Sequence, residues 1–336
     1  MTAPGTLLLR ADASTAIGAG HVMRCLALAQ EWAGRGGTAV FASRELDGMA
    51  RDRVVDEGFE RVAVGARATT RDAANAVGAW AVVLDVGPGV RDELAALAAH
   101  RTCVIDDSGV AFDETPSLVV NQNAHGPATP YTGVASQAVL TGLDYVMLRD
   151  EFLAVRPNPR RSDEAADILL ALGGTDPLGL LPALSNAVLD AVAATIHVAV
   201  SSRHPALAQL EQLAARNARL RLHVDTRDMP RVMAGVDLAV TAGGTAVWEL
   251  AYMGVPALVG TVSEVEQRLV DGLRALGLYR VLGDFAALSA VAIAIAAADA
   301  SADPAWRRAT SDAARRVIDG QGRRRVVDAL LEVSQA

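Results

Sequence analysis

The chain of 336 residues contains no lysine, so all 31 of its strongly basic side chains are arginine. This absence excludes a Schiff base on a lysine amine and a phosphate-binding loop of the Walker type, which uses a lysine to reach the phosphates. Cysteine is scarce too: Cys25 and Cys103 both lie in apolar runs, and we expect both to be buried thiols. No cluster of cysteine and histidine has the spacing of a zinc site.

Long apolar runs are also missing. The alanine-rich stretch at 290–298 is too short to span a bilayer, and the N-terminus lacks the basic and apolar regions of a signal peptide. We therefore expect a cytoplasmic protein without membrane insertion. The formal net charge of −8 argues against a nucleic-acid partner. A hydrophobic content of 51% with 21% charged residues is typical of a folded protein, here long enough for two domains.

Strand-like runs alternate with helix-length segments along the chain, and repeated units of this kind form parallel sheets covered on both faces. The expected strands are 6–10, 38–42, 61–64, 81–85, 102–106 and 117–120, then 167–172, 195–201, 220–224, 237–241 and 256–260. From about Phe285 to Leu331 the pattern is helical. The sequence predicts an α/β protein with two Rossmann-like domains facing a cleft: residues 1–155 and 165–336, joined by a linker at 156–164.

The segment from Arg10 to Arg24 carries the strongest chemical signal. Gly18 and Gly20 allow a tight turn between a strand and an amphipathic helix, and His21 falls in the first turn of that helix. The positive end of the helix dipole predicts a neutral His21 that can accept a proton. A glycine loop at a helix start also suits an anionic ligand. Taken alone, the same residues fit an ordinary strand-to-helix turn with a polar residue near the cap.

A second glycine turn follows the strand at 237–241. The helix-start amides near Gly243, Gly244 and Thr245 predict a diphosphate site, because these N–H groups have no partner within the helix. Glu249 lies four residues after Thr245, on the same helical face, and its carboxylate can accept from two ribose hydroxyls. A capped helix with a solvated Glu249 is the alternative reading.

Three shorter motifs follow other expected strands. Gly173 to Asp176 forms a comparable turn, in which Gly174 and Thr175 fit a phosphate and Thr175 or Asp176 can instead cap the next helix. Asn121 and Asn123 carry carboxamides that suit sugar hydroxyl or acetamido groups, although Asx turns explain them equally well. Asp106 and Asp107 are a possible carboxylate site, without an Asp-x-Asp metal pair. Of the other histidines, His125 is the best further candidate.

With these residues in hand, the chain resembles the UDP-sugar hydrolases of pseudaminic acid biosynthesis, which cleave UDP-2,4-diacetamido-2,4,6-trideoxy-β-L-altropyranose. More broadly it resembles the GT-B glycosyltransferases related to the enzyme that adds N-acetylglucosamine to form lipid II. The resemblance covers nearly the whole chain. It is carried by Arg10-x-Asp12-x-Ser14-x-x-Ile17-Gly18-x-Gly20-His21-Val22-x-Arg24-Cys25, Ile105-Asp106-Asp107, Asn121-Gln122-Asn123, Tyr145-x-x-Leu148-Arg149-x-Glu151-Phe152, Gly173-Gly174-Thr175-Asp176, Gly243-Gly244-Thr245 with Trp248-Glu249-Leu250, and Glu266-Gln267.

The resemblance implies a GT-B-like fold and an inverting hydrolysis that needs neither metal nor cofactor and releases UDP and a free sugar. His21 is then the residue near the anomeric carbon. The implied ligands of the sugar are Arg10, Asp12, Gly18, Gly20, Asn121, Asn123 and Tyr145, and those of the nucleotide are Gly174, Thr175, Gly243, Gly244, Thr245, Glu249 and Gln267.

One position departs from the family pattern. Family members usually carry Asp-x-Tyr where this chain has Asp85-Val86-Gly87, so the resemblance implies cleavage of a nucleotide sugar but does not assign the altrose derivative, and the glycine leaves room for a larger or differently substituted sugar. A glycosyltransferase using the same UDP-sugar donor and a small acceptor is the main alternative, because one histidine can activate water or an acceptor hydroxyl. A catalytically idle nucleotide-sugar binder is the third. The sequence does not fix the oligomeric state.

Overall fold

The structure is a computed structural model that describes residues 5–14, 17–109, 111–155, 163–174 and 176–333. It divides into two compact units, which are described separately. Unit 1 comprises Met1–Asp150 and Gly320–Ala336, and unit 2 comprises Glu151–Asp319. Residues 156–162 of the expected linker lie outside the described residues.

Unit 1 is built on a parallel sheet, which contains seven strands within the described residues, in the order β3-β2-β1-β4-β5-β6-β7. The strands are β1 (Thr6–Ala11), β2 (Thr38–Ser43), β3 (Glu60–Ala63), β4 (Ala79–Asp85), β5 (Thr102–Ile105), β6 (Leu118–Asn121) and β7 (Val139–Thr141). The helices are α1 (Gly20–Gly34), α2 (Gly48–Asp56), α3 (Thr70–Ala76), α4 (Val90–Ala96) and α13 (Gly322–Glu332). Every strand expected in this half is present; the three-residue edge strand β7 was not expected.

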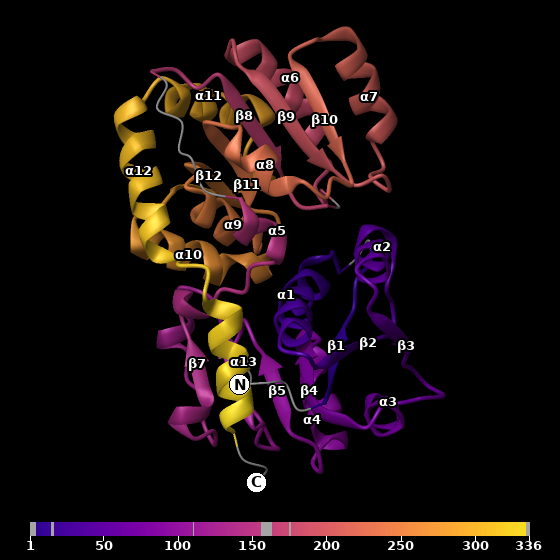
Figure 1. Cartoon of the computed structure of the whole chain (residues 1–336). Helices are drawn as coiled ribbons and strands as arrows, with labels where there is room; N and C mark the ends of the chain where they lie inside the picture. The colour runs from indigo at the N-terminus through magenta and orange to yellow at the C-terminus, as the bar shows by residue number, and fades with distance from the viewer. Residues whose placement is uncertain (1–4, 15–16, 110, 156–162, 175, 334–336) are drawn as a thin grey trace. The chain divides into compact units, whose positions relative to one another are not determined.

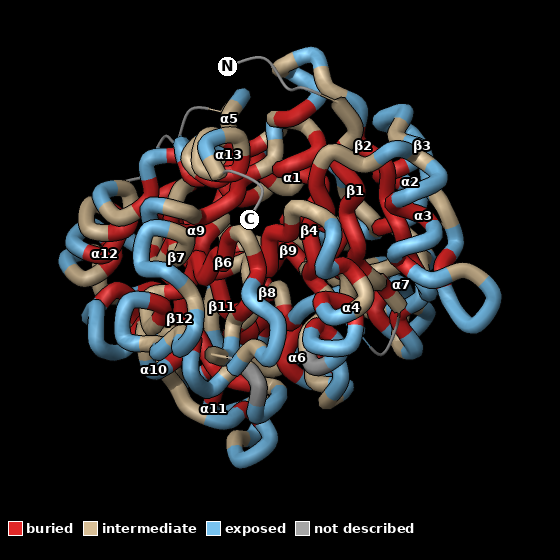
Figure 2. The backbone as a smooth tube through the Cα atoms, turned by 90° about the horizontal axis from the view of Figure 1, so that it is seen from below, coloured by how far each residue is buried: buried red, intermediate tan, exposed pale blue. Residues whose placement is uncertain are grey.

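The side chains of β1 alternate between two hydrophobic layers, as the period of a strand requires. Leu7 and Leu9 point into a layer shared with α1, α2 and α13, whereas Leu8 points into a layer shared with α3 and α4. All three leucines are fully buried, and the central strands are buried along most of their length in Figure 2.

Unit 2 repeats the architecture with the strand order β10-β9-β8-β11-β12-β13, again all parallel. The strands are β8 (Asp167–Ala171), β9 (Thr195–Val200), β10 (Leu220–Val224), β11 (Leu238–Ala242), β12 (Ala257–Thr261) and β13 (Arg280–Asp284). The helices are α6 (Leu181–Ala191), α7 (Leu207–Arg216), α8 (Met229–Ala234), α9 (Ala246–Met253), α10 (Gln267–Leu276), α11 (Ala290–Ser301) and α12 (Pro304–Val317), while α5 (Asp150–Ala154) spans the unit boundary. Helices α6, α7 and α11 share one hydrophobic layer with the sheet. Both strand orders are of the doubly wound, Rossmann-like type.

The last helix corrects the expected domain boundaries. The sequence expectation placed all of 165–336 in the second domain, but α13 belongs to unit 1, where it contacts α1 and β6 (Figure 1). Val326, Val327 and Leu330 are buried in the same hydrophobic layer as α1. The close approach is visible at Gly322, where a Cβ would lie 2.2 Å from the carbonyl oxygen of Val146.

Candidate active site

The strand order of unit 1 determines where its polar residues meet. β1 and β4 are neighbours at the point where the order reverses, and Ala11 pairs with Asp85 at their carboxyl ends. Ligands of open α/β sheets bind at this position. α1 begins nine residues after β1 ends, which brings His21 to the same edge as Asp85.

His21 and Asp85 form a close pair. The Nδ1 atom of His21 lies 2.6 Å from Oδ1 of Asp85, and the His21 side chain is 29% exposed while that of Asp85 is fully buried. Because a carboxylate only accepts, Nδ1 carries the proton of this bond and donates it. In the neutral imidazole Nε2 is then the proton acceptor.

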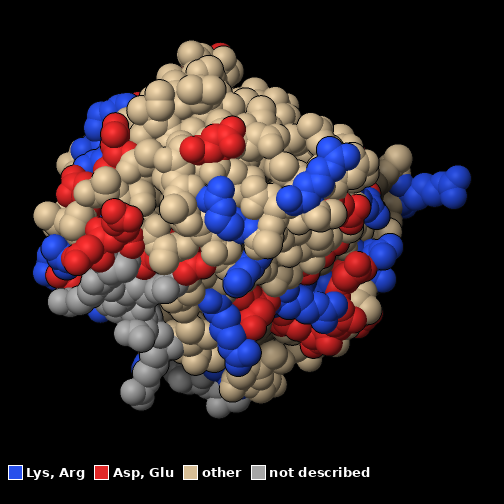
Figure 3. Space-filling model, turned by 90° about the horizontal axis from the view of Figure 1, so that it is seen from above, with Lys and Arg blue, Asp and Glu red and all other residues tan. Residues whose placement is uncertain are grey.

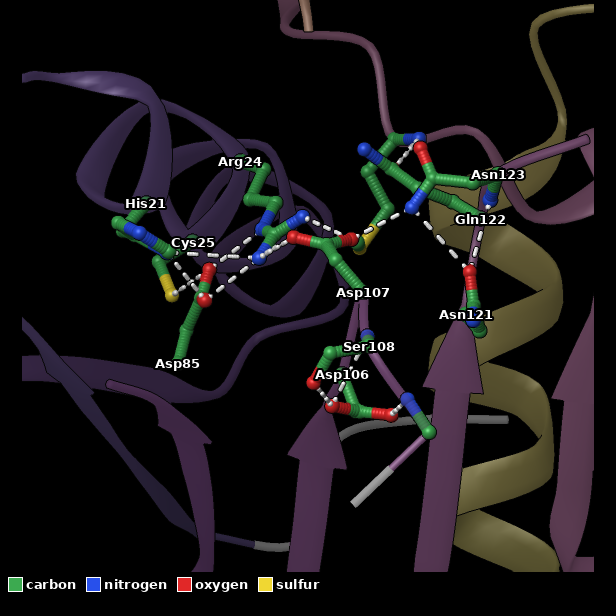
Figure 4. Close-up of polar contacts among 12 residues, drawn as sticks. His21, Arg24, Cys25, Asp85, Asp106, Asp107, Ser108, Asn121, Gln122 and Asn123 are labelled. Atoms are coloured by element: carbon green, nitrogen blue, oxygen red, sulfur yellow. Dashed lines mark hydrogen bonds and ion pairs between the residues drawn. The ribbon is translucent and has the colours of Figure 1, made fainter. Parts of the chain in front are cut away.

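Arg24 holds two carboxylates with one guanidinium (Figure 4). On one side its Nε and Nη2 donate to Asp85 at 2.5 and 2.7 Å. On the other side Nη1 and Nη2 lie 2.9 and 2.8 Å from the two oxygens of Asp107. Both contacts are bidentate, the strongest arrangement for an arginine and a carboxylate. Arg24 lies one turn after His21 on α1, and its bonds hold the carboxylates of Asp85 and Asp107 in place near the imidazole.

The direction of the pKa shift of His21 differs from the one that the helix dipole alone predicts. The carboxylate of Asp85 raises the pKa of His21 above its usual 6.5, against the effect of burial. The expectation rested on the helix dipole, which amounts to about half a charge spread over the first turn. A full negative charge in direct contact outweighs it. Arg24 and His21 in turn hold the pKa of Asp85 far below its usual range, despite its burial.

Asparagines complete this cluster from the neighbouring strand. The side-chain amide of Asn123 donates to Oδ1 of Asp107 at 2.6 Å. Asn121 is fully buried; its Oδ1 accepts from the backbone N–H and side chain of Asn123, and its amide donates to the hydroxyl of Tyr131. Asn123 therefore helps to fix the carboxylate of Asp107, and the buried Asn121 fixes Asn123 through hydrogen bonds.

Arg10 and Asp12 lie at the end of β1. Arg10 is 1% exposed, and its guanidinium contacts Asp12 at 2.7 Å and Glu93 at 3.3 Å. Oδ1 of Asp12 accepts from the backbone N–H groups of Arg44 and Glu45. These bonds tie the loop after β1 to the loop after β2. A direct contact of Arg10 with a sugar stays a prediction.

The glycines of the first motif shape the turn into α1. Gly18 has a φ of +81°, a conformation that favours glycine, and its N–H donates to the carbonyl of Ser14 at 2.8 Å. Gly20 is the first residue of α1. Tyr145, in contrast, packs against the hydrophobic layer that includes α1 and α13. No hydrogen bond joins it to the described residues of the His21 cluster, which consists of His21, Arg24, Asp85, Asp107 and Asn123.

In unit 2 the second glycine turn occupies the equivalent place. β8 and β11 are neighbours where the strand order reverses, and Thr241 pairs with Ala171 near their carboxyl ends. A Cβ on Gly243 would lie 2.5 Å from Cγ2 of Val270, whereas one on Gly244 would meet nothing within 4 Å. Gly243 is thus required by packing, and Gly244 borders open space.

The predicted nucleotide residues lie around this turn. Thr245 is the N-cap of α9, and Glu249 lies in its first turn, partly exposed. Gln267 begins α10, is exposed, and donates to Asp271 at 2.9 Å. Glu266 accepts from the backbone N–H groups of Val262 and Gly243, and burial raises its pKa. Glu266 therefore joins the loop before α10 to the glycine turn.

The third turn follows β8. Gly173 has a φ of +83° and Gly174 borders open space, while Thr175 lies outside the described residues. The carboxylate of Asp176 accepts from the backbone N–H groups of Leu180, the N-cap residue of α6, and of Leu181, the first residue of that helix. His204 contacts the same carboxylate at 3.3 Å, with both side chains buried.

Cys25 and Cys103 are free and buried, as expected. Across the described residues, no group of three or more histidine, cysteine, aspartate or glutamate side chains is arranged to hold a metal ion, and no helix is long and apolar enough to cross a membrane. The face in Figure 3 carries arginine and acidic side chains interspersed.

Comparisons with known proteins were made by sequence and by structure. No family model matches the chain. The spore coat polysaccharide biosynthesis protein SpsG of Bacillus subtilis is 29% identical over 133 residues, which cover 39% of this chain and 39% of that protein. The UDP-2,4-diacetamido-2,4,6-trideoxy-β-L-altropyranose hydrolase of Campylobacter jejuni is 24% identical over 231 residues, 68% of this chain and 81% of that enzyme. The sequence resemblance is thus confirmed as a distant one.

The structural comparison addresses the fold. The crystal structure of CalG4, the calicheamicin glycosyltransferase, matches with a TM-score of 0.66 at 18% identity, covering 99% of this chain and 100% of that one. The fold is GT-B-like. The predicted α/β, GT-B-like fold with two Rossmann-like domains is therefore confirmed.

The sequence analysis gave no separate role to Asp85 or Arg24, and it named Asp107 only as part of a possible carboxylate site with Asp106. Asp85 is 64 positions from His21 in the sequence, and the two residues meet because β1 and β4 are adjacent strands of the sheet. A doubly wound order assumed from the start would have indicated Asp85, because it ends the strand beside β1. Arg24 was visible as a charged residue three positions after His21, on the same face of the helix.

Proposed function

We propose that this protein is a nucleotide-sugar hydrolase that cleaves a UDP-linked amino or deoxy sugar into UDP and free sugar, with inversion and without a metal ion. The observation that carries the proposal is the His21–Asp85 pair, partly open to solvent, at the carboxyl edge of the unit 1 sheet. The similarity to the Campylobacter jejuni hydrolase over 68% of this chain supports the substrate class.

His21 acts as the general base in this proposal. Asp85 accepts a hydrogen bond from Nδ1–H and orients the ring, so that Nε2 takes a proton from water as the water oxygen bonds to the anomeric carbon. The bond from that carbon to the diphosphate oxygen breaks, and its electron pair leaves with the diphosphate. The proton on Nε2 then passes to solvent. General-base catalysis of this kind contributes about 10²–10⁴-fold to the rate.

Unit 2 holds the nucleotide in the proposal. Backbone N–H groups at the start of α9, next to Gly244 and Thr245, stabilise the charge on the departing diphosphate. Glu249 accepts from the ribose hydroxyls, and Gly174 and Gln267 border the same ligand. A preorganised set of amide donors suits a chain without lysine, because it supplies positive charge from the backbone.

The sugar specificity is proposed to differ from that of the altrose derivative. Gly87 has a φ of +58°, and a Cβ there would meet nothing within 4 Å. The position two residues after Asp85 therefore offers space where relatives carry a tyrosine. A sugar with a larger or different substituent fits this change.

A glycosyltransferase is the second candidate, favoured by the GT-B-like fold that the chain shares with CalG4 over 99% of its length. The same histidine would then deprotonate an acceptor hydroxyl instead of water. The donor, the leaving group and the nucleotide site would be unchanged.

Incubation of the purified protein with a panel of UDP-sugars separates these functions. With EDTA present and no acceptor, the hydrolase predicts release of UDP together with a free reducing sugar. UDP binding without cleavage, followed by turnover when small sugar acceptors are added, would establish the transferase. A protein that binds neither UDP nor any UDP-sugar would contradict both.

A further inference from the structure

Asp107 is the member of the His21 cluster with the most solvent-exposed side chain. Its side chain is 36% exposed and that of His21 is 29% exposed, whereas those of Arg24 and Asp85 are 5% and 0% exposed. The cluster therefore offers a ligand two groups, an imidazole and a carboxylate. Nη2 of Arg24 lies 3.4 Å from Nδ1 of His21 and 2.8 Å from Oδ2 of Asp107, so the two groups flank one nitrogen atom (Figure 4).

The carboxylate of Asp107 retains capacity to accept. Among the described residues Oδ1 contacts Arg24 and Asn123, and Oδ2 contacts Arg24 alone. A carboxylate has about four acceptor positions, so the exposed edge of Oδ2 can take one more donor. The charges favour such a donor, because Arg24, Asp85 and Asp107 together carry one net negative charge while His21 is neutral.

Asp107 is also held rigidly. His125 contacts its backbone carbonyl through Nε2 at 2.8 Å, and that nitrogen must donate because a carbonyl only accepts. The preceding carboxylate, Asp106, accepts from Ser108, from the backbone N–H of Gly109 and from the hydroxyl of Tyr131, which fixes the turn. An acceptor immobilised before binding loses little entropy when a ligand arrives.

We propose that Asp107 is a sugar-binding residue that accepts a hydrogen bond from the hydroxyl or N–H group on the carbon next to the anomeric carbon. The inference rests on the proposed function, in which His21 activates water at the anomeric carbon. Asp107 and His21 both lie next to Nη2 of Arg24, so a sugar held at His21 brings its substituents near the reacting carbon toward Asp107, and we assign Asp107 to the substituent on the adjacent carbon. The site thus selects sugars with a donor at this position and disfavours sugars without one.

Calorimetry with UDP, UDP-glucose and UDP-2-deoxy-2-fluoroglucose tests the proposal, because fluorine replaces the donor hydroxyl with a group of similar size that cannot donate. We expect the wild-type protein to bind UDP-glucose at least 10-fold more tightly than the fluoro analogue, since sites built for a donor discriminate against its absence. In Asp107→Asn the ratio should fall to within about two-fold, while UDP affinity stays within about two-fold of wild type.

Two further variants keep the test decisive. Asp113→Asn changes an exposed aspartate in the same loop and should leave the ratio intact. Asp107→Ser serves if the asparagine variant does not fold, and should likewise abolish the ratio. A wild-type protein that does not discriminate, or an Asp107 variant that still does, overturns the inference. Failure of the wild-type protein to bind UDP would instead overturn the proposed function.

Discussion

At the scale of single residues, Arg24 determines the electrostatics of the candidate site. It is buried, it pairs with Asp85 and Asp107, and it lies one helical turn from His21. A buried guanidinium is stable only with its partners in place, and removal of one partner from a buried ion pair costs about 3–5 kcal/mol. The arrangement therefore links the stability of unit 1 to the geometry around His21.

His21→Ala tests the assignment of the base. We expect turnover to fall by about two decades or more, because the variant loses the proton acceptor. UDP affinity should stay within about two-fold of wild type, since the residues proposed to bind the nucleotide lie in unit 2. Steady-state kinetics and calorimetry give the two numbers. A parallel loss of UDP affinity and turnover would point to a structural role.

The pH dependence tests the contact between His21 and Asp85. Asp85 raises the pKa of His21 above 6.5, and only the neutral imidazole accepts a proton, so kcat/KM should fall as the pH drops through a value above 6.5. The same raised pKa stabilises the folded state fully below about 6.5 and loses this contribution as the pH rises through the folded pKa.

Asp85→Asn removes the charge that causes this shift. The acidic limb of the kcat/KM profile should move to lower pH, and kcat should fall because the ring is no longer held by a carboxylate. Thermal melting should also reveal a loss of stability, since Arg24 keeps only Asp107. An acidic limb at the wild-type position would show that another group titrates in the profile.

At the scale of elements, the glycine turn before α9 combines packing with binding. Gly243 approaches Val270 and Glu266 so closely that a Cβ would lie 2.5 and 3.2 Å from their atoms, but Gly244 has no such neighbour. Two glycines next to each other in sequence are thus required for different reasons. Sequence alone predicted the turn but not this division.

Alanine substitutions separate the two reasons. Gly243→Ala should destabilise the protein by about 1–3 kcal/mol through overpacking, with a lower melting temperature. Gly244→Ala should melt close to wild type and still bind UDP more weakly, because its methyl group enters the space proposed for the diphosphate. Calorimetry and thermal melting on both variants decide; unchanged UDP binding in Gly244→Ala would move the diphosphate elsewhere.

The strands differ in how well the sequence pattern predicts them. The strands from β1 through β6 and from β8 through β12 were predicted to within a few residues, including β3 and β10, whose sequences mix polar and apolar residues. Two edge strands were not predicted: β7, which has only three residues, and β13, which has no fully buried position among its five. The pKa of His21 was predicted in the wrong direction, since its main cause lies on a strand 64 positions away.

At the scale of the whole molecule, the chain returns to unit 1 at its end. A local sequence pattern predicts the amphipathic helix α13 but not the layer that it covers. In the structure α13 covers the hydrophobic layer of unit 1 that includes α1, where Val326, Val327 and Leu330 are at most 1% exposed. The C-terminal helix is therefore part of the unit that carries His21.

Leu330→Ala tests this placement. The loss of a fully buried leucine should cost about 2–5 kcal/mol in the stability of unit 1. Arg324→Ala is the matched control on the same helix, because its side chain is 66% exposed and should contribute little. Hydrogen exchange of the β1 and α1 amides would report the change. Equal protection in the two variants would contradict the packing of α13 on unit 1.

The central claim is that water attacks the anomeric carbon of a nucleotide sugar. Hydrolysis in water enriched in oxygen-18, followed by mass spectrometry of both products, tests it most directly. The account predicts the label in the free sugar and none in UDP, because the bond between carbon and oxygen breaks. Label in the phosphate of the nucleotide would mean attack at phosphorus and would contradict the account.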